Sequence, residues 1–347
     1  MSGPVLHIDL DGFAANLTVV RARVAPAQLM LVVKDDAYGH GIERIVRRAA
    51  AEGVRWFGSF DVREALRTRS AAGPDARIFS WLTVGRAEIA EALSADIDLG
   101  VGDRGFLEDI AAVAGAVGAV ARVHLKVDTG LHRNGIRPEE WPEVLDRARA
   151  LEHEGAVRIV GVWSHIAEAS DHEDDVARAL FDAAVAAAEA AGFTIEVRHL
   201  SASAASFARP EFRYDLVRVG AFCYGVRSAG GPSDADLGIR PIAALSAPVT
   251  HVSEHAVTIG VGSLHGLPSS LAKRARLAPG QGRLSVERVD LGHTVIAAWP
   301  HAAVGDEITV FGAGAASATD LAEAIGTVGE EILVRVSPLV PRIYRGE

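Results

Sequence analysis

The sequence predicts an α/β protein, a (β/α)8 TIM-type barrel followed by a mainly-β C-terminal domain. Eight apolar, β-rich runs alternate with helical patterns up to about residue 224, as expected for a parallel sheet that closes on itself. A Gly/Pro/Ser/Asp-rich run at 226–236 is then typical of a linker. Beyond it, strand patterns follow one another without long helices, which predicts an all-β second domain.

In chain order, a short strand at 5–9 and a helix at about 11–24 come before the barrel. The eight barrel strands are expected at 29–34, 56–60, 77–82, 97–101, 121–128, 157–164, 195–200 and 216–224. The intervening helices are expected at 41–52, 61–71, 85–94, 104–116, 138–153, 173–191 and, as a shorter piece, 203–208. An open doubly wound sheet is the alternative, but no Gly-x-Gly-x-x-Gly follows the first strand.

The second domain should contain several strands joined by Gly and Pro turns, with one short helix. The strands are expected at 241–252, 255–260, 283–289, 293–298 and 307–311, and the helix at 318–326. We therefore expect two domains, 1–230 and 231–347, with residues 1–8 as a segment that could pair with the β domain.

Composition and charge narrow the function. The chain has 347 residues, 49% of them hydrophobic, and a net charge of −10, which argues against nucleic acid or an anionic membrane as a partner. Its single cysteine, Cys223, excludes an intrachain disulfide framework and a cysteine-based zinc cluster. Neither a signal-type N-terminus nor an apolar run of about 18 residues is evident, so we expect a cytoplasmic protein.

Lys34 is the first candidate for chemistry. It closes the apolar run Leu29-Met-Leu-Val-Val33 and precedes a small loop with Tyr38 and Gly39. In barrels and open α/β sheets, ligands bind at this end of a strand. A lysine there is partly desolvated, so it loses its proton more easily and suits Schiff-base chemistry. The alternative is a lysine that extends from the strand end to the surface.

Other polar residues follow the predicted strands at the same end of the barrel. They are Lys126, Asp128 and Arg133 after the fifth strand, His165 after the sixth, Ser201 and Ser203 after the seventh, and Arg218, Gly220 and Tyr224 on or after the eighth. This set has too few clustered carboxylates for a magnesium or glycosidase site, and no Gly-x-Ser-x-Gly elbow. A lysine with phosphate-binding elements suggests pyridoxal phosphate.

Two motifs resemble those of the bacterial alanine racemases. Val32-Val-Lys-Asp-Asp-Ala-Tyr-Gly-His-Gly41 is similar to the cofactor-lysine motif, and Lys126-Val-Asp-Thr-Gly-Leu-His-Arg133 is similar to the second motif. Ser164-His165, the segment from Ser203, Val217-Arg218-Val-Gly220, Tyr224-Gly225 and Val340-Pro-Arg-Ile-Tyr344 follow in the family's order. The resemblance runs nearly end to end, and it implies a pyridoxal 5'-phosphate enzyme that acts as a head-to-tail homodimer with shared active sites.

The resemblance also implies roles for single residues. Lys34 would bind the cofactor covalently and act as one of two bases at the substrate α-carbon. Arg133 would bond the phenolic oxygen of the cofactor. Lys126, which is carbamylated in many relatives, would hold Arg133 in place. His165 would lie near the pyridine ring, and Arg218 would face its nitrogen. The remaining cofactor residues, which include the phosphate contacts, would be Tyr38, Ser203, Gly220, Ala221 and Tyr224.

The second domain departs from the family at the opposite-face base. Relatives have a catalytic tyrosine there, whereas Val261-Gly-Ser-Leu-His-Gly-Leu-Pro268 places Ser263 at that position, and no tyrosine lies between 225 and 343. A serine hydroxyl without a base is too weakly acidic to replace a phenol. Because a histidine exchanges protons near neutral pH, His265 is the candidate replacement; a turn histidine at the dimer rim is the alternative.

Two further departures lie in the same domain. Leu291-Gly292 stands where relatives have the Met-Asp pair that binds the substrate carboxylate, and Glu330 stands at a phosphate-contacting tyrosine. Asp290, His293 and His301 lack the spacing of a zinc site, so no metal site is predicted.

The resemblance therefore predicts a racemase that interconverts L- and D-amino acids, alanine or a related small amino acid, and so supplies D-amino acids for the cell wall. Two alternatives keep the cofactor. One is a lyase of the D-amino-acid aldolase or dehydratase type, and the other is a catalytically impaired protein that only binds pyridoxal phosphate. The missing tyrosine keeps both open, because inversion needs proton transfer on both faces of the α-carbon.

Overall fold

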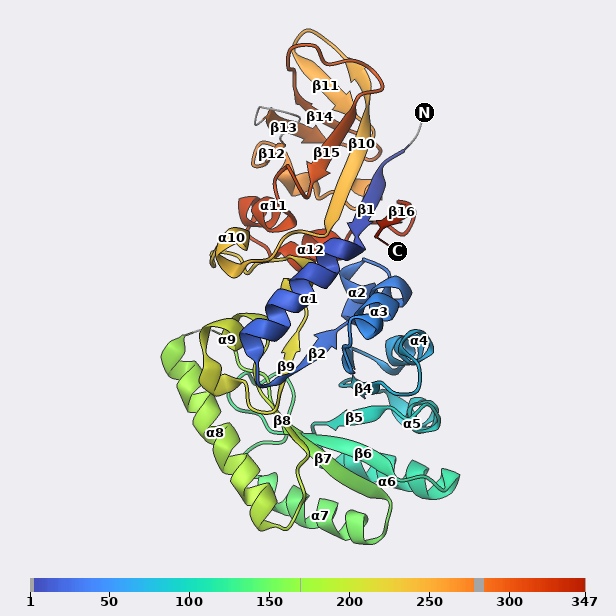
Figure 1. Ribbon diagram of the computed structural model, residues 1–347, viewed down its shortest axis with the longest axis vertical. Coiled ribbons are helices and arrows are strands. Elements are labelled where there is room, and N and C mark those ends of the chain that lie inside the picture. Colours follow the sequence, from blue (N-terminus) through green and yellow to red (C-terminus); the bar gives the residue numbers. More distant parts are fainter. Residues whose placement is uncertain (1–2, 169, 278–283, 347) are drawn as a thin grey trace. The chain divides into compact units, whose positions relative to one another are not determined.

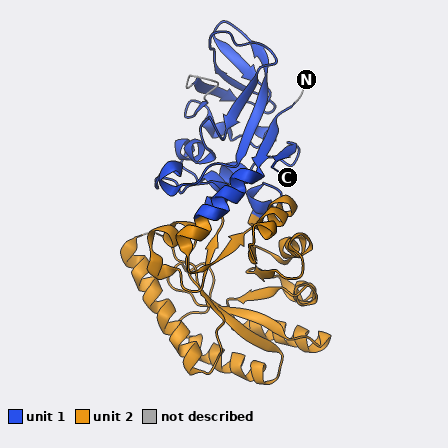
Figure 2. Cartoon of the chain, in the orientation of Figure 1, with its two compact units in different colours: residues 1–19, 35–41, 221–347 blue, residues 20–34, 42–220 orange. Residues whose placement is uncertain are grey.

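The computed structural model describes residues 3–168, 170–277 and 284–346. It divides into two compact units, coloured separately in Figure 2. The barrel unit comprises residues 20–34 and 42–220, and the β unit comprises residues 1–19, 35–41 and 221–347. Helix α1 (Leu10–Val24) crosses from the β unit into the barrel unit. The predicted division at residue 230 stays a prediction.

The barrel unit contains an eight-stranded sheet in which every paired neighbour is parallel. The order is β8-β7-β6-β5-β4-β3-β2-β9, so the chain adds strands in sequence and the last lies beside the first (Figure 1). The strands are β2 (Gln28–Val32), β3 (Trp56–Ser59), β4 (Arg77–Ser80), β5 (Asp98–Val101), β6 (Ala121–Lys126), β7 (Val157–Trp163), β8 (Val197–His199) and β9 (Leu216–Val219). The predicted TIM-type barrel and mainly-β second domain are confirmed.

Strands β8 and β9 close the barrel without a full ladder. The Asp215 N–H donates to the Arg198 carbonyl at 3.3 Å, and the Arg218 N–H donates to the Ser201 carbonyl at 3.2 Å. These two bonds flank a gap that the β2–β3 and β7–β8 ladders do not have. Side chains must therefore hold this seam together.

Helices follow most of the barrel strands on the outside (Figure 1). They are α3 (Ile42–Ala51), α4 (Val62–Ala72), α5 (Gly85–Ser94), α6 (Arg104–Val117), α7 (Trp141–His153), α8 (Asp171–Ala190) and α9 (Ser203–Ala208). Several begin at a side-chain cap: Asp61 accepts from the Glu64 N–H, Asp103 from the Phe106 N–H and Ser170 from the Glu173 N–H. Such caps satisfy N–H groups that a helix start leaves unpaired.

Large apolar side chains from several strands fill the barrel. One cluster consists of Met30, Trp56, Phe79, Trp163, Val197 and Leu216, all buried, with Trp81 packed against it. This agrees with a parallel sheet covered on both faces, whose interior is a packed core rather than a pore.

The β unit is built on a second eight-stranded sheet, with the order β12-β13-β14-β11-β10-β1-β16 and β15 paired to β10. Its strands are β1 (Val5–Asp9), β10 (Ala243–Val252), β11 (Ala256–Ile259), β12 (Arg276–Leu277), β13 (Leu284–Val289), β14 (Thr294–Ala297), β15 (Glu307–Phe311) and β16 (Arg342–Arg345). Strand β1 pairs antiparallel with β10 and parallel with β16, so residues near both ends of the chain lie in the same sheet. Helices α10 (Asp234–Leu237), α11 (Ala318–Ile325) and α12 (Gly329–Val334) complete the unit.

The structure differs from expectation at five short elements. Helices α2 (Lys34–Tyr38), α10 and α12 and strands β12 and β16 were not predicted, and α10 begins within the run expected as a linker. Residue 283, the first residue of the strand predicted at 283–289, lies outside the described residues. No described helix combines the length and apolar character needed to cross a bilayer.

Gly225 permits a close backbone contact within the β unit. Its φ is +69°, and a Cβ atom there would overlap the Arg240 carbonyl and lie 2.6 Å from the Pro241 nitrogen. Gly326 also has a left-handed φ, +74°, but nothing lies within 4 Å of the place of its Cβ. Substitution of Gly326 therefore tests backbone strain alone, whereas substitution of Gly225 tests strain together with steric overlap.

We predict that Gly225→Ala lowers the free energy of unfolding by more than about 4 kcal/mol, since strain and overlap add. Gly326→Ala should lower it by only about 1–2 kcal/mol, the penalty of the left-handed conformation. Urea unfolding followed by circular dichroism measures both. Equal losses in the two variants would contradict the steric argument.

Candidate active site

Lys34 lies at the carboxyl end of β2, as predicted. The Val33 N–H donates to the Gly58 carbonyl at 2.9 Å, which extends the pairing with β3 to the residue before the lysine. Lys34 is half-buried and begins α2. Lys34 therefore directly follows the last residue of this segment that is paired in the barrel sheet.

The segment after Lys34 is a left-handed turn. Asp35, Asp36, Ala37 and Tyr38 all have φ near +55°, and this conformation costs a non-glycine residue about 1–2 kcal/mol. A local bond from His40 Nδ1 to the Ala37 carbonyl at 2.8 Å supports the turn, and burial lowers the pKa of His40 to about 4. Tertiary contacts hold it as well, because the rings of Tyr38 and His40 both pack on Tyr224. Strained backbone of this kind concentrates at functional sites.

Lys126 ends β6 inside the barrel unit. It is 5% exposed, and its Nζ lies 4.7 Å from the Trp163 ring centre. Burial, together with the charges of Arg218 and Arg133, lowers its pKa to about 8, while Asp128 opposes this shift. Lys126 is thus a buried amine that is protonated at neutral pH, although its pKa lies only about one unit above pH 7.

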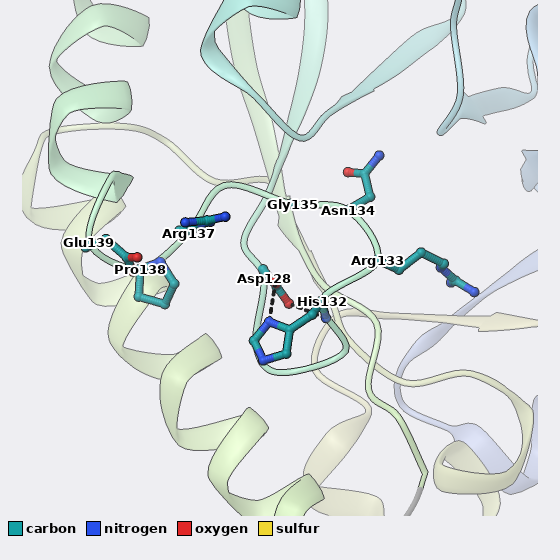
Figure 3. Close-up of a pocket in the computed structure, with 8 residues that line it drawn as sticks. All are labelled: Asp128, His132, Arg133, Asn134, Gly135, Arg137, Pro138 and Glu139. Atoms are coloured by element: carbon teal, nitrogen blue, oxygen red, sulfur yellow. Dashed lines mark hydrogen bonds and ion pairs between the residues drawn. The ribbon is translucent and has the colours of Figure 1, made fainter.

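The loop after Lys126 turns around Asp128. This carboxylate accepts the Gly130 and His132 N–H groups at 3.1 Å each and bonds the His132 ring at 2.9 Å. The loop lines a pocket of about 460 Å³, shown in Figure 3. In that view Arg133 extends away from the Asp128–His132 pair, so its guanidinium is presented outside the turn.

Arg218 is buried on β9 and binds the ends of two other strands. Nη1 donates to the His199 carbonyl at 2.9 Å and to His199 Nδ1 at 3.0 Å. Nη2 donates to the carbonyls of Ser164 and Leu200 at 2.7 and 2.9 Å. Burial lowers the pKa of Arg218 to about 9, so the group is cationic at neutral pH. Among the described residues, the hydrogen bonds of this guanidinium are made by Nη1 and Nη2.

His165 follows β7 and lies beside Arg218, with 3.3 Å between its Nδ1 and Arg218 Nη2. Burial, followed by the charges of Arg218, Arg133, Lys126 and Lys34, lowers the pKa of His165 to about 3. A neutral imidazole therefore lies among four cationic side chains. Such surroundings favour an anionic ligand.

The serines and glycine predicted for phosphate binding also lie at this end of the barrel unit. The Ser201 hydroxyl is buried and has no hydrogen-bond partner among the described residues. Ser203 begins α9, and Gly220 is buried directly after β9. An unpartnered buried hydroxyl in a native site points to a group that is bound there.

The other predicted residues belong to the β unit. The rings of Tyr38 and Tyr224 lie 4.9 Å apart, and the His40 ring stacks on Tyr224 at 4.9 Å. Ala221 begins the turn that carries Tyr224, and both are buried. The structure thus brings Tyr38 and Tyr224 together within this unit.

Ser263 and His265 share one turn of the β unit. Ser263 is exposed and His265 is half-buried. The Gly262 N–H donates to His265 Nδ1 at 3.0 Å, so a neutral His265 ring carries its proton on Nε2. Nearby, Asp290 bonds Arg288 and His293 at 2.7 and 2.9 Å. Within the described part of the chain, no three potential ligands gather around a metal position.

Sequence reasoning missed the polar residues in the barrel interior: His124, His199 and Asp98. Each lies on a strand that was predicted, and each is fully buried. In the sequence, each of these residues is a polar side chain within an apolar run. That pattern alone does not show which residue the side chain bonds.

Comparison with known proteins gives one family for both parts of the chain. Residues 8–228 match the family described as alanine racemase, N-terminal domain, and residues 246–344 match alanine racemase, C-terminal domain. An alanine racemase of Beutenbergia cavernae is 38% identical over 367 residues, covering 98% of this chain and 97% of that protein. One of Thermobifida fusca is 34% identical, covering 98% and 97%.

Solved structures agree. Alanine racemase from D-cycloserine-producing Streptomyces lavendulae has a TM-score of 0.93 and 34% identity, covering 100% of this chain and 98% of that chain. Alanine racemase from Streptomyces coelicolor has a TM-score of 0.95 and 33% identity, covering 99% and 98%.

The lowered pKa of Lys126 should make the free energy of unfolding depend on pH. Its folded-state pKa of about 8 lies below the ordinary 10.5, so below about pH 8 the folded state bears the full burial penalty. As the pH rises toward 10.5 the folded state releases its proton first, and the penalty disappears.

We predict that Lys126→Met raises the free energy of unfolding at pH 7 by about 1–3 kcal/mol, after allowance for solvent screening. The gain should shrink between pH 8 and 10. Urea unfolding in bicarbonate-free buffer, which keeps the amine unmodified, gives the profile. The exposed Lys273→Met is the control and should show no such trend. A gain that is constant with pH would contradict the assignment.

Proposed function

The chain belongs to the alanine racemase family, and on that premise we propose that it interconverts the L and D forms of alanine or a related small amino acid, with pyridoxal 5'-phosphate as its cofactor. The observation that carries the proposal is the cluster of Lys34, Lys126, Arg133 and Arg218 around a neutral His165. This arrangement suits a cofactor that brings a phosphate and a phenolate.

The residues present fit that cofactor. The Ser201 hydroxyl is buried without a partner in the described chain, and the hydrogen bonds of Arg218 there are made by Nη1 and Nη2. Lys34 supplies an amine at a strand end. A site with unused donors and excess positive charge is incomplete without an anionic, hydrogen-bonding ligand.

By the family resemblance, Lys34 holds the cofactor covalently, Arg133 bonds its phenolic oxygen, His165 contacts its ring and Arg218 faces its nitrogen. The remaining contacts, which include those to the phosphate, come from Tyr38, Ser203, Gly220, Ala221 and Tyr224. When bound, pyridoxal phosphate takes up the electrons of a bond broken at the substrate α-carbon.

Arg218 then determines what happens to the proton. Its guanidinium donates a hydrogen bond but retains its proton at neutral pH, even with a pKa lowered by burial to about 9. Arg218 would therefore donate a hydrogen bond, and not a proton, to the ring nitrogen of the cofactor. This would favour prompt return of a proton to the α-carbon, which is what a racemase requires.

Inversion needs a second proton-transfer group on the face opposite Lys34. We assign this role to the turn of Ser263 and His265, which a head-to-tail homodimer would bring to the partner's site. The bond from the Gly262 N–H to His265 Nδ1 keeps the proton on Nε2. Accepting a proton at Nδ1 requires that bond to break, so slow inversion is expected.

Lys34 can be tested directly. In deuterated buffer we expect either enantiomer of alanine to gain α-deuterium and lose optical purity, and the purified protein to show the visible absorption band of its lysine-bound cofactor. Lys34→Arg keeps the charge but should abolish the band and lower exchange by more than about 10³-fold. Lys273→Arg is the matched control. A Lys34→Arg protein that retains both would overturn the cofactor assignment.

His265 is tested by a variant that preserves its turn. In His265→Asn the Oδ1 atom can accept the Gly262 N–H as Nδ1 does, but the titratable ring is gone. We expect inversion to fall by about 10²-fold while Lys34 still exchanges one enantiomer. Ser263→Ala should change little. Unchanged inversion in His265→Asn would exclude His265, and exchange without inversion in the unsubstituted protein would favour the lyase or impaired alternatives.

A further inference from the structure

A chain of hydrogen-bonded side chains crosses the interior of the barrel unit and ends on Arg218. His199 Nδ1 lies 3.0 Å from Arg218 Nη1, and His199 Nε2 lies 2.9 Å from His124 Nδ1. His124 Nε2 in turn lies 3.2 Å from Asp98 Oδ2. Asp98, His124 and His199 are completely buried, and Arg218 is 5% exposed. The chain therefore joins β5, β6, β8 and β9 without water.

The protons of this chain have one consistent arrangement. Arg218 can only donate, so His199 Nδ1 must accept and His199 Nε2 must carry the proton. His124 Nδ1 must then accept from His199, and His124 Nε2 donates to Asp98. Every bond points toward the carboxylate, and burial, followed by the charge of Arg218, lowers the pKa of His199, which keeps its ring neutral.

The surroundings are shaped to hold these rings. Trp163 stacks on His199 with 5.7 Å between centres and 7° between planes, and Phe79 packs against His124 at 4.6 Å. On β7, Gly161 leaves the space for His124, because a Cβ atom there would overlap the ring and lie 2.8 Å from its Cγ. Buried polar groups are costly unless fully bonded, so both imidazoles are confined to this arrangement.

The far end of the chain supplies the negative charge that Arg218 lacks nearby. No carboxylate in the described residues lies within ion-pair distance of Arg218. Asp98 pairs with Arg77 at 2.5 Å and with Arg122 at 2.5 Å. Burial raises the pKa of Asp98, but His124 and these arginines outweigh it and bring the pKa to about 2. Asp98 is therefore a fixed anion, connected to Arg218 through two rings.

We propose that Asp98 and His124 are positioning residues for Arg218: they fix the proton of His199 on Nε2, so that Nη1 of Arg218 is bound inward and its Nε–H is presented to the pyridoxal phosphate ring. This inference rests on the proposed function for the ligand only. The arrangement of protons is a property of the barrel itself.

Two conservative variants of His124 test its two hydrogen bonds separately, the one with His199 and the one with Asp98. In His124→Asn the Oδ1 atom replaces Nδ1, so it can accept from His199 although the bond to Asp98 is lost. In His124→Gln the amide replaces Nε2, so it can donate to Asp98 but leaves His199 Nε2 without an acceptor. Each variant loses one of the two ring hydrogen bonds, and His124→Asn removes the larger side-chain volume, but only His124→Gln frees the proton of His199.

The first readout uses the cofactor-free protein labelled with nitrogen-15 in its histidines. Nitrogen shifts distinguish the two imidazole tautomers, and the His199 signal is assigned by its loss in His199→Phe. We expect the Nε2–H tautomer in the unsubstituted protein and in His124→Asn, and a mixture in His124→Gln. The Nδ1–H tautomer in the unsubstituted protein, or an unchanged tautomer in His124→Gln, would overturn the proposal.

The second readout is the dissociation constant of pyridoxal phosphate, from titration of the visible band. We expect about a 10-fold or greater weakening in His124→Gln and less than about threefold in His124→Asn, in line with losses of outer-sphere partners elsewhere. Equal affinities in the two variants would overturn the positioning role.

A control variant accounts for general loss of stability. Thr68 is buried in the same unit and bonds the Glu64 carbonyl at 2.8 Å, remote in sequence from the four residues. Thr68→Val should leave both the tautomer and the affinity unchanged; a change in either would assign these effects to stability and overturn the proposal. If the unsubstituted protein binds no pyridoxal phosphate, the proposed function fails, and the tautomer alone decides whether the chain of bonds exists.

Discussion

The barrel depends on a guanidinium placed where its last two strands fail to form a ladder. Arg218 on β9 donates to the carbonyls of Ser164, His199 and Leu200, which lie at the ends of β7 and β8. The His199 carbonyl also accepts the Ser164 N–H at 3.2 Å. Without Arg218, however, the carbonyls of Ser164 and Leu200 would lose their donor, a loss of about 1–3 kcal/mol each. The residue that closes the barrel is therefore also the one proposed to face the cofactor, and its position is tied to the fold.

The concentration of positive charge at that end of the barrel unit has a thermodynamic consequence. Arg218 and Lys126 are both buried, and burial lowers the pKa of each, so the folded chain holds two cations at a free-energy penalty. A ligand carrying negative charge reverses the penalty and must stabilise the folded state through its binding free energy. This charge distribution supports the proposed anionic cofactor, and the chain belongs to the alanine racemase family.

The sequence was sufficient for the fold and for the position of Lys34, because both follow from periodicity and from the rule that strand ends carry function. It was not sufficient for α2, since four consecutive left-handed residues without glycine reflect tertiary contacts such as those of Tyr38 and His40 with Tyr224, not local preference. Nor could alternation within a strand reveal that His124 and His199 bond each other. Their pairing depends on the register of β6, β7 and β8 and on the space left by Gly161. The roles of the predicted site residues stay predictions.

The contacts of the four tyrosines bear on the chemical identity of the proposed second base. The Tyr344 hydroxyl donates to the His40 carbonyl at 2.9 Å, and Tyr214 donates to Asp182 at 2.6 Å, with its pKa raised by burial. Tyr38 and Tyr224 are buried against each other. Each phenol therefore has a structural contact within the chain, and on the proposed function the proton-transfer group opposite Lys34 would be of another chemical type. His265 is the group proposed for this role, and one backbone bond, from the Gly262 N–H to Nδ1, sets its tautomer. On that proposal, the rate of inversion depends on how readily this bond opens.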